Sequence, residues 1–233
     1  MFLITQPFSQ EAEVSEILSF PMSPLMLAPC ETALAVAAAY GEVRIYDMRE
    51  VTSPVEGVSF SYCSETGNGK RRKVRNLTVL CWGPVSRQQL ALGSEDHLVT
   101  VWTLASTACK VATLAHSSAP ITDLCWQSGS APDTEVLVSC SRDGQLRLYS
   151  PDHWSLLLVF SSSADPFLRI ALDPTRSLLC ACSQSGLLSL FDLRSRKRTT
   201  QWRTLGKGTS GLSWRAQWLG LVSGVNSLQV FAV

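Results

Sequence analysis

Histidine and cysteine are the residue types in this chain best suited to metal binding or catalysis, and it has three histidines and eight cysteines. His97, His116 and His153 are widely separated, and none has a second histidine or a carboxylate at metal-ligand spacing. Cys180 and Cys182 are the closest cysteine pair and would face the same side of a strand, but a zinc site needs two further ligands. The sequence therefore predicts neither a metal site nor a cofactor.

The segment Gly206-Lys207-Gly208-Thr209-Ser210 is similar to the end of a phosphate-binding loop. The full loop needs a glycine five residues before the Gly-Lys pair, where this chain has Gln201, and a helix after it. Leu212-Ser213-Trp214 has the pattern of a strand instead. We interpret the segment as a connecting loop, and we expect no small-molecule substrate.

Composition limits the classes of protein to which the chain can belong. Hydrophobic residues make up 45% and charged residues 17%, which is enough apolar material for a core, and the net charge of +1 excludes a polyanion-binding chain as a whole. The start Met1–Ile4 has no signal-peptide pattern, and the apolar stretch Leu25–Tyr40 is broken by Pro29 and Glu31. Scattered cysteines without a C-x-x-C pair indicate reduced thiols. We expect a cytoplasmic or nuclear protein with no membrane partner.

One pattern occurs five times along the chain. Each copy has a short apolar run, a tight polar or glycine turn such as Asp143-Gly144, and an alternating strand that ends in an aromatic residue. A further short strand precedes each copy, and Leu80-Cys81-Trp82 and Leu124-Cys125-Trp126 are near repeats of each other. A fourth short run follows the middle copies. The closing aromatic residues are Tyr46, Trp102, Tyr149, Phe191 and Phe231.

Four short strands in roughly 40–45 residues are the period of a propeller blade. A single four-stranded blade cannot bury its own apolar faces, and radial stacking of blades does so. We therefore predict an all-β, single-domain β-propeller of four-stranded blades. The predicted blades cover residues 15–60, 74–115, 119–161, 166–206 and 208–233, and residues 1–8 are a candidate to complete the last one.

The segment Leu114–Tyr149 resembles a WD repeat. It has Ala115-His116 where that family has Gly-His, and it ends in Leu148-Tyr149 where the family has Trp-Asp. The resemblance implies a hydrogen-bonded network within the blade, and the matching positions are His116, Ser139, Asp143 and Tyr149.

The number of blades stays open, because seven are usual in the family and five are readable here. One alternative is a closed five-blade ring in which Phe2–Thr5 pairs with the last strand. The other is a part of a longer propeller.

Two clusters of basic residues lie between apolar strands. The first is Lys70–Lys73 with Arg75, and the second is Arg194 with Arg196–Arg198. Either is a candidate nuclear-localisation signal or a contact for an acidic partner, and a solvated loop is the simpler interpretation. The first cluster has no interleaved aromatic residues, so we do not expect nucleic-acid binding.

The resemblance implies a non-catalytic scaffold that binds other proteins within a multiprotein complex. Family partners usually sit on the face that carries the turns between second and third strands. Arg, Tyr and Trp dominate binding hot spots, which makes Arg142, Tyr40 and the loop residue Trp154 the candidate anchors. Asp96 and His97 fall in one of these turns and complete the predicted partner site.

Two alternative functions remain. Asp47 with Arg49, and Asp192 with Arg194, resemble the Trp-Asp-x-Arg motif with which some WD-repeat proteins dock on the adaptor of a cullin-type ubiquitin ligase. A propeller-type hydrolase is the second alternative, but it needs converging histidines and carboxylates. We therefore predict that the chain is not an enzyme.

Overall fold

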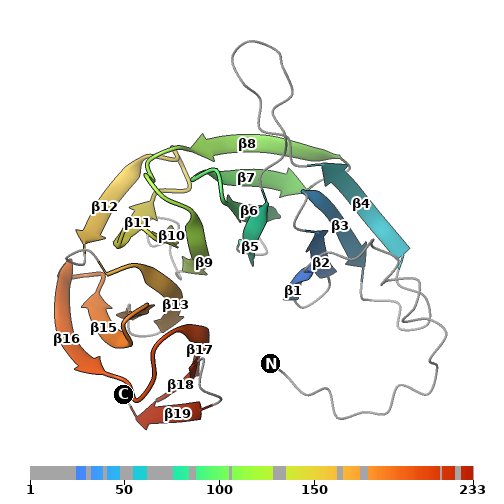
Figure 1. Cartoon of the computed structure of the whole chain (residues 1–233). Coiled ribbons are helices and arrows are strands. Elements are labelled where there is room, and N and C mark those ends of the chain that lie inside the picture. The colour runs from blue at the N-terminus through green and yellow to red at the C-terminus, as the bar shows by residue number, and fades with distance from the viewer. Residues whose placement is uncertain are drawn as a thin grey trace, which may run out of the picture.

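The structure is a computed structural model that describes residues 25–29, 33–38, 41–47, 55–61, 76–83, 88–104, 107–127, 135–161, 165–173, 178–215, 217–223 and 227–232. Every regular element in these ranges is a β-strand, and the strands form five antiparallel sheets. The sheets are arranged as successive blades of an arc (Figure 1). The predicted all-β propeller fold is confirmed.

The first sheet contains β1 (Leu25–Pro29), β2 (Ala33–Ala38), β3 (Glu42–Asp47) and β4 (Val55–Ser61). The second contains β5 (Leu77–Trp82), β6 (Gln89–Ser94), β7 (Val99–Leu104) and β8 (Ala108–Leu114). The third contains β9 (Ile121–Gln127), β10 (Val136–Ser141), β11 (Gln145–Tyr149) and β12 (Leu156–Ser161). The fourth contains β13 (Phe167–Asp173), β14 (Leu178–Ser183), β15 (Leu187–Asp192) and β16 (Lys197–Arg203). The last contains β17 (Thr209–Arg215), β18 (Trp218–Ser223) and β19 (Ser227–Ala232).

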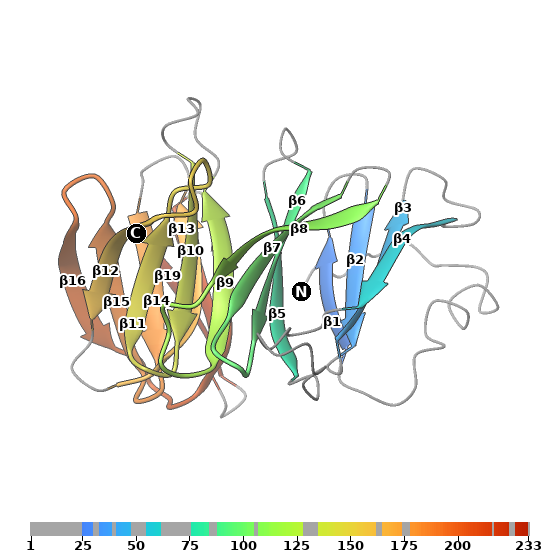
Figure 2. The ribbon, with the colours of Figure 1, turned by 90° about the horizontal axis from the view of Figure 1, so that it is seen from above.

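Strand order in each sheet follows chain order, so each blade is a simple up-and-down meander. The first strands β1, β5, β9, β13 and β17 line the inside of the arc, and the fourth strands β4, β8, β12 and β16 form its outside (Figure 1). Seen from above, the strands run between two ends of the molecule, where the described turns lie (Figure 2). Side chains in turns at one end therefore lie far from those at the other.

The hydrophobic core lies between the blades, which explains why the second strands are apolar on both faces. On β14, Leu179 and Ala181 pack into a cluster with Val138 of the third blade. The alternate residues Cys180 and Cys182 pack on the other side, in a cluster with Leu219 and Leu221 of the last blade. One strand thus contributes to two interfaces, because successive side chains point to opposite faces of a sheet.

The last described blade has an exposed apolar face. Leu188 and Leu190 of the fourth blade are 0% and 9% exposed, because the last blade covers them. Strand register places Leu228 and Val230 at the corresponding positions of the last blade, and these are 70% and 58% exposed. The last and first sheets are not joined by strand pairing within the described residues. The proposed partner for this blade, Phe2–Thr5, lies outside those residues.

A left-handed backbone position recurs in the turns between second and third strands. Gly144 has φ of 74° and Gly186 has φ of 84°, and His97 occupies the equivalent position with φ of 72°. A left-handed conformation costs a non-glycine residue roughly 1–2 kcal/mol, whereas glycine adopts it freely but loses more backbone entropy on folding.

His97→Gly is therefore expected to raise the free energy of unfolding by about 0.5–1 kcal/mol, as measured by urea denaturation. Gly186→Ala is the contrasting variant, because a Cβ there would collide with the carbonyl oxygen of Gly206. It is expected to destabilise the fold clearly. A neutral Gly186→Ala together with a destabilising His97→Gly would contradict this account of the turns.

Candidate functional site

Three turns display different side chains at equivalent positions at one end of the molecule. In each, the backbone N–H of the tip residue donates to the carbonyl of a residue just before the first strand of its own blade. These hydrogen bonds fix every tip to the inner edge of its sheet. The pairs are Glu95 to Asn76 at 2.9 Å, Arg142 to Pro120 at 3.0 Å and Gln184 to Pro166 at 2.8 Å. We call the surface formed by Glu95, Arg142 and Gln184 the turn face; all three residues are exposed.

The residue after each tip turns back into the blade. The Ser94 hydroxyl donates to the Asp96 carboxylate, and Ser141 makes the same bond to Asp143. Asp96 and His97 are both half-buried. Of the predicted partner residues in this turn, Asp96 therefore supports the loop that displays Glu95.

Asp143 is the centre of the hydrogen-bonded network in the third blade. It accepts from Arg147, with 2.7 Å between Nη2 and Oδ2, and from the Ser117 hydroxyl and the Ser118 backbone N–H at 3.2 Å each. The ion pair is almost fully buried, since the Arg147 and Asp143 side chains are 5% and 8% exposed. Burial alone would raise the pKa of Asp143, but hydrogen bonds from Arg147 and Ser141 hold it well below its usual range.

The other predicted members of this network, His116, Ser139 and Tyr149, lie in the same blade, and their hydrogen bonding within the network stays a prediction. His116 is exposed and contacts Tyr149 through its ring, with 5.6 Å between ring centroids. Ser139 is buried on β10 and lies opposite Arg147 in the strand register. The sequence pattern alone does not single out Arg147, because the alternation of Gln145–Tyr149 puts Arg147 on the polar side of the strand. The available signal was its spacing of four residues from Asp143 across a tight turn.

Trp154 lies at the other end of the blade from Arg142, in the connection between β11 and β12. It packs edge-to-face on Trp126, with 5.9 Å between ring centroids, and adjoins the core cluster of the second and third blades. Two further predicted residues, Tyr40 and Arg49, lie outside the described residues. Arg142 is thus the predicted anchor that the structure places exposed on the turn face.

The described adaptor-docking candidates, Asp47, Asp192 and Arg194, lie away from the turn face, because third strands run from the turns toward the opposite end. Asp47 and Asp192 are the last residues of β3 and β15. Asp192 accepts a hydrogen bond from the Arg194 backbone N–H at 2.9 Å. Hydrogen bonding from Ser195 and from Arg194 lowers the pKa of Asp192. Docking on a ligase adaptor stays a prediction.

A carboxylate and three thiols lie together between the inner strands. Burial raises the pKa of Asp123 to about 6, although its oxygens accept from the backbone N–H groups of Ile170 at 2.9 Å and Leu124 at 3.0 Å. Burial likewise raises the pKa of Cys81 to about 12, and those of Cys125 and Cys140 are also raised. Thiols with such pKa values are poor nucleophiles and poor bases at neutral pH. The raised pKa values therefore keep the three thiols protonated at neutral pH, and Asp123 is the group of this cluster that titrates near pH 6.

The described part of the chain contains no group of three or more histidine, cysteine or acidic residues placed to hold a metal ion. It also contains no helix long and apolar enough to cross a membrane.

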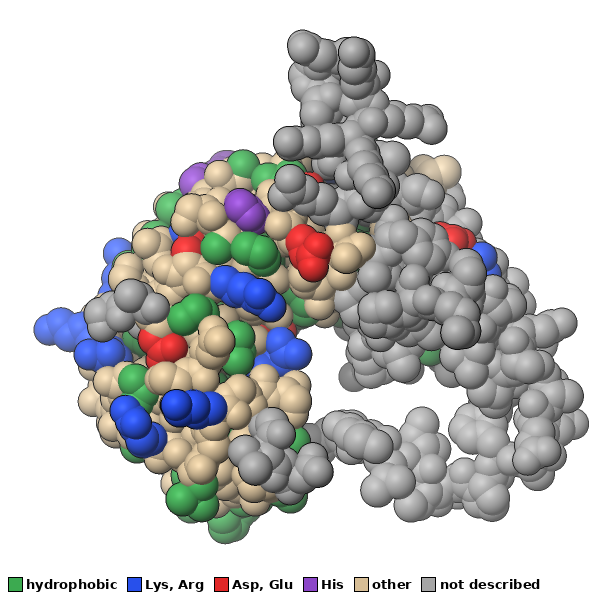
Figure 3. Space-filling model, viewed as in Figure 1, with side chains coloured by type: hydrophobic (Ala, Val, Ile, Leu, Met, Phe, Trp, Pro, Cys, Tyr) green, Lys and Arg blue, Asp and Glu red, His purple; other side chains and the backbone are tan. Residues whose placement is uncertain are grey.

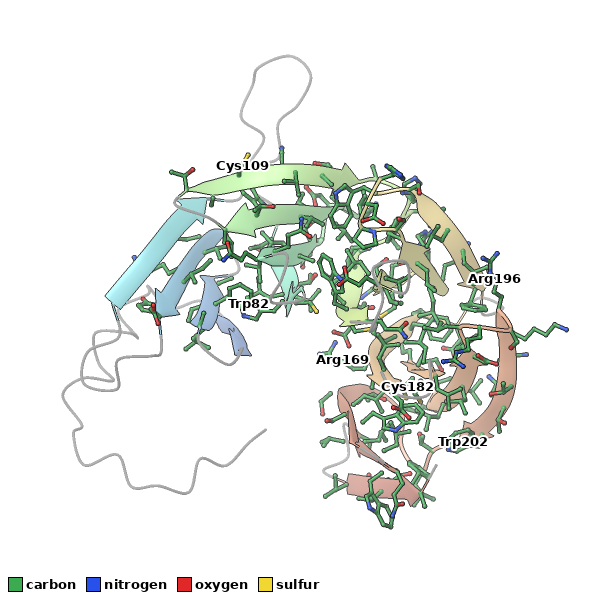
Figure 4. The ribbon with its side chains drawn as sticks, turned by 180° about the vertical axis from the view of Figure 1, so that it is seen from behind. Trp82, Cys109, Arg169, Cys182, Arg196 and Trp202 are labelled. Atoms are coloured by element: carbon green, nitrogen blue, oxygen red, sulfur yellow. The ribbon has the colours of Figure 1, made fainter. Side chains whose placement is uncertain are left out.

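Cys109 is the one exposed thiol of the described residues and lies on the outer strand β8 (Figure 4). We expect Cys109 to react with a maleimide in the native protein, whereas the fully buried Cys140, Cys180 and Cys182 react only after unfolding. Peptide mapping by mass spectrometry distinguishes these sites, and Cys109→Ser is the control. Equal labelling of Cys109 and Cys182 under native conditions would contradict the arrangement.

Comparisons with known proteins show which family and which proteins the chain resembles. The WD domain, G-beta repeat family (WD40) matches residues 108–150. Pre-rRNA-processing protein IPI3 from Mycosarcoma maydis is 30% identical over 159 residues, which is 59% of this chain and 27% of that protein. Protein transport protein Sec31A from Gallus gallus is 24% identical over 164 residues, covering 69% of this chain and 12% of that protein. The chain thus spans about a quarter and about an eighth of the length of these relatives.

Among solved structures, a crystal structure of the computationally designed Ika8 protein matches with a TM-score of 0.67 and 13% identity, covering 89% of this chain and 57% of that chain. This likeness concerns the fold alone. Taken with the five repeated blades, the family match over the third of them and the sequence relatives lead to one conclusion: residues 108–150 match a WD repeat, and the chain resembles WD-repeat proteins.

Proposed function

We propose that this chain is a non-catalytic WD-repeat scaffold that binds other proteins within a multiprotein complex in the cytoplasm or nucleus. The observation that carries the proposal is the turn face, where Glu95, Arg142 and Gln184 are held by equivalent backbone hydrogen bonds and exposed to solvent. Similarity to proteins named for pre-rRNA processing and protein transport supports a role inside larger assemblies.

The rigidity of the turn face favours binding. A loop that is already fixed loses little conformational entropy when a partner docks, so more of the contact energy appears as affinity. The three tips carry a negative, a positive and a neutral polar side chain, which suits recognition of a partner with a matching charge pattern. Arg142 is the expected anchor, because arginine is enriched among the residues that contribute most to binding.

The experiment is affinity purification of the tagged chain followed by quantitative mass spectrometry. Exchanging the charges with Glu95→Arg and Arg142→Glu is expected to reduce recovery of the main partners at least tenfold. Lys110→Glu on the outer strand β8 is the matched control, because it also reverses an exposed charge but lies off the turn face.

Each variant's melting temperature must match the wild type, so that loss of partners reflects the surface and not the fold. Full recovery of all partners by the exchanged variant would remove Arg142 and the turn face from the proposal. An Arg194→Ala arm of the same experiment tests the ligase alternative, which requires a cullin adaptor to be recovered with the wild type and lost from this variant.

A further inference from the structure

The outer strand of the fourth blade carries a concentration of positive charge. Lys197, Arg198 and Arg203 lie on β16, and Arg194 and Arg196 lie in the turn before it; all five are exposed. We call these five residues the basic edge. Residues 178–233 contain seven Lys or Arg and one Asp, a net charge of +6 within a chain of net charge +1. Lys and Arg side chains gather over this part of the molecule (Figure 3), and Arg196 lies at its outer rim (Figure 4).

Strand β16 is the last strand of its sheet, so one row of its backbone N–H and C=O groups is open to pairing. The pairing of β16 with β15 changes register at a β-bulge between Leu190 and Phe191 of β15. On one side of this bulge, Thr200–Arg203 pairs regularly with β15. The open edge of β16 thus has two parts. One is the regular stretch Thr200–Arg203, which ends in Arg203, and the other, on the far side of the bulge, carries Lys197 and Arg198. Seven strand residues span roughly 20 Å.

Protection against aggregation does not account for the basic edge. Lysine often blunts an exposed strand edge, and every outer strand of the arc would need such protection. The equivalent strand β8 has a single Lys110, and β12 has no charged residue and exposes Leu157 and Val159 instead. Among the described outer strands whose side chains are placed, a cluster of positive charges is therefore particular to β16.

The aromatic residue of β16 faces away from this edge. Trp202 is partly buried and packs on Phe231 of the last blade, with 6.1 Å between ring centroids (Figure 4). Single-stranded nucleic acid binding usually combines positive charge with aromatic rings that stack on the bases. The basic edge offers charge and an open backbone edge but no stacking surface, which favours an extended polypeptide over RNA.

We propose that the basic edge binds an acidic, extended segment of a partner protein, which pairs with Thr200–Arg203 as an additional strand. Backbone hydrogen bonds supply part of the affinity, and carboxylates at both ends of the segment meet Arg203 on one side and Lys197 with Arg198 on the other. This surface is separate from the turn face, so the two proposals stand or fall independently.

The test measures fluorescence anisotropy of a labelled alternating Glu–Thr peptide of about twelve residues with the full chain at low and moderate salt. The variant Lys197→Glu/Arg198→Glu/Arg203→Glu is expected to bind at least tenfold more weakly, whereas Lys110→Glu, on the outer strand β8, binds as the wild type does. The same Glu–Thr peptide, N-methylated at alternate backbone nitrogens, is expected to lose most of its affinity for the chain, because it cannot donate the backbone hydrogen bonds that strand pairing needs.

Two results would overturn the proposal. Undiminished binding of the N-methylated peptide would show that charge alone attracts the peptide, without strand addition. Tighter binding of a single-stranded oligouridine that depends on the same three residues would assign the basic edge to nucleic acid. Hydrogen exchange of the β16 amides keeps the test valid if the triple variant unfolds, because added peptide is expected to protect them in the wild type.

Discussion

Asp143→Asn is expected to lower the free energy of unfolding by about 2–4 kcal/mol. The substitution leaves the Arg147 guanidinium almost fully buried without its counter-charge, and breaking a buried ion pair costs far more than the intact pair contributes. It also weakens the bonds from Ser117 and Ser118 that tie the turn to the segment before β9. Chemical denaturation at neutral pH measures the change.

A double-mutant cycle distinguishes this explanation from a simple loss of contacts. Asp143→Asn combined with Arg147→Met removes both charges and is expected to be more stable than Asp143→Asn alone. Asp152→Asn is the matched control, since Asp152 is exposed, and it should change stability by less than about 0.5 kcal/mol. Equal effects of the Asp143 and Asp152 variants would show that the pair contributes little.

The second large effect concerns pH: we expect the free energy of unfolding to fall as pH rises from the ordinary pKa of Asp123 to its raised pKa in the folded protein. Its pKa is about 6 in the folded protein against an ordinary value of 3.8, so the folded state binds the proton more tightly than the unfolded chain does. The stabilisation is complete below pH 4 and is lost as pH rises to 6 and above. A shift of this size corresponds to about 3 kcal/mol at most.

Asp123→Asn is expected to flatten this part of the pH profile, because the amide does not titrate. The variant keeps an oxygen that can accept from the Ile170 N–H, which links β9 to β13 of the next blade. Urea denaturation of both proteins at pH 4, 5, 6 and 7 measures the difference. Parallel profiles for the two proteins would contradict a raised pKa at this position.

Asp143 and Asp123 contribute to stability in opposite directions as the pH changes. Asp143 has a lowered pKa, so its contribution is present above the ordinary carboxyl range and is lost only at strongly acidic pH. Asp123 acts in the opposite direction over the range from pH 4 to 6. The two residues lie in the same blade, and the difference arises because Asp143 has a cationic partner in hydrogen-bonding contact whereas Asp123 is held by backbone N–H groups among thiols.

Local pattern was sufficient to predict the architecture. The alternation in Gln145–Tyr149, the Asp143-Gly144 turn and the two-sided apolar runs each depend on a few neighbouring residues, and the same pattern recurs along the chain. Repetition made the stacking of blades predictable, because a thin sheet with two apolar faces has few other ways to bury them. The exposed position of Arg142 followed from the turn alone.

Positions that depend on the neighbouring blade were decided only by the tertiary structure. Alternation placed Arg147 on a polar face, and the fold buried it against Asp143, because the adjoining turn covers that face. Trp154 has the residue type of a binding anchor, but Trp126 covers it at the far end of the blade. Asp123 has a raised pKa because the packed strands remove it from water, an effect that outweighs the hydrogen bond from the Ile170 N–H, 47 residues later in the chain. Sequence fixes the side chain and its local direction, whereas burial and electrostatic environment come from segments distant in the chain.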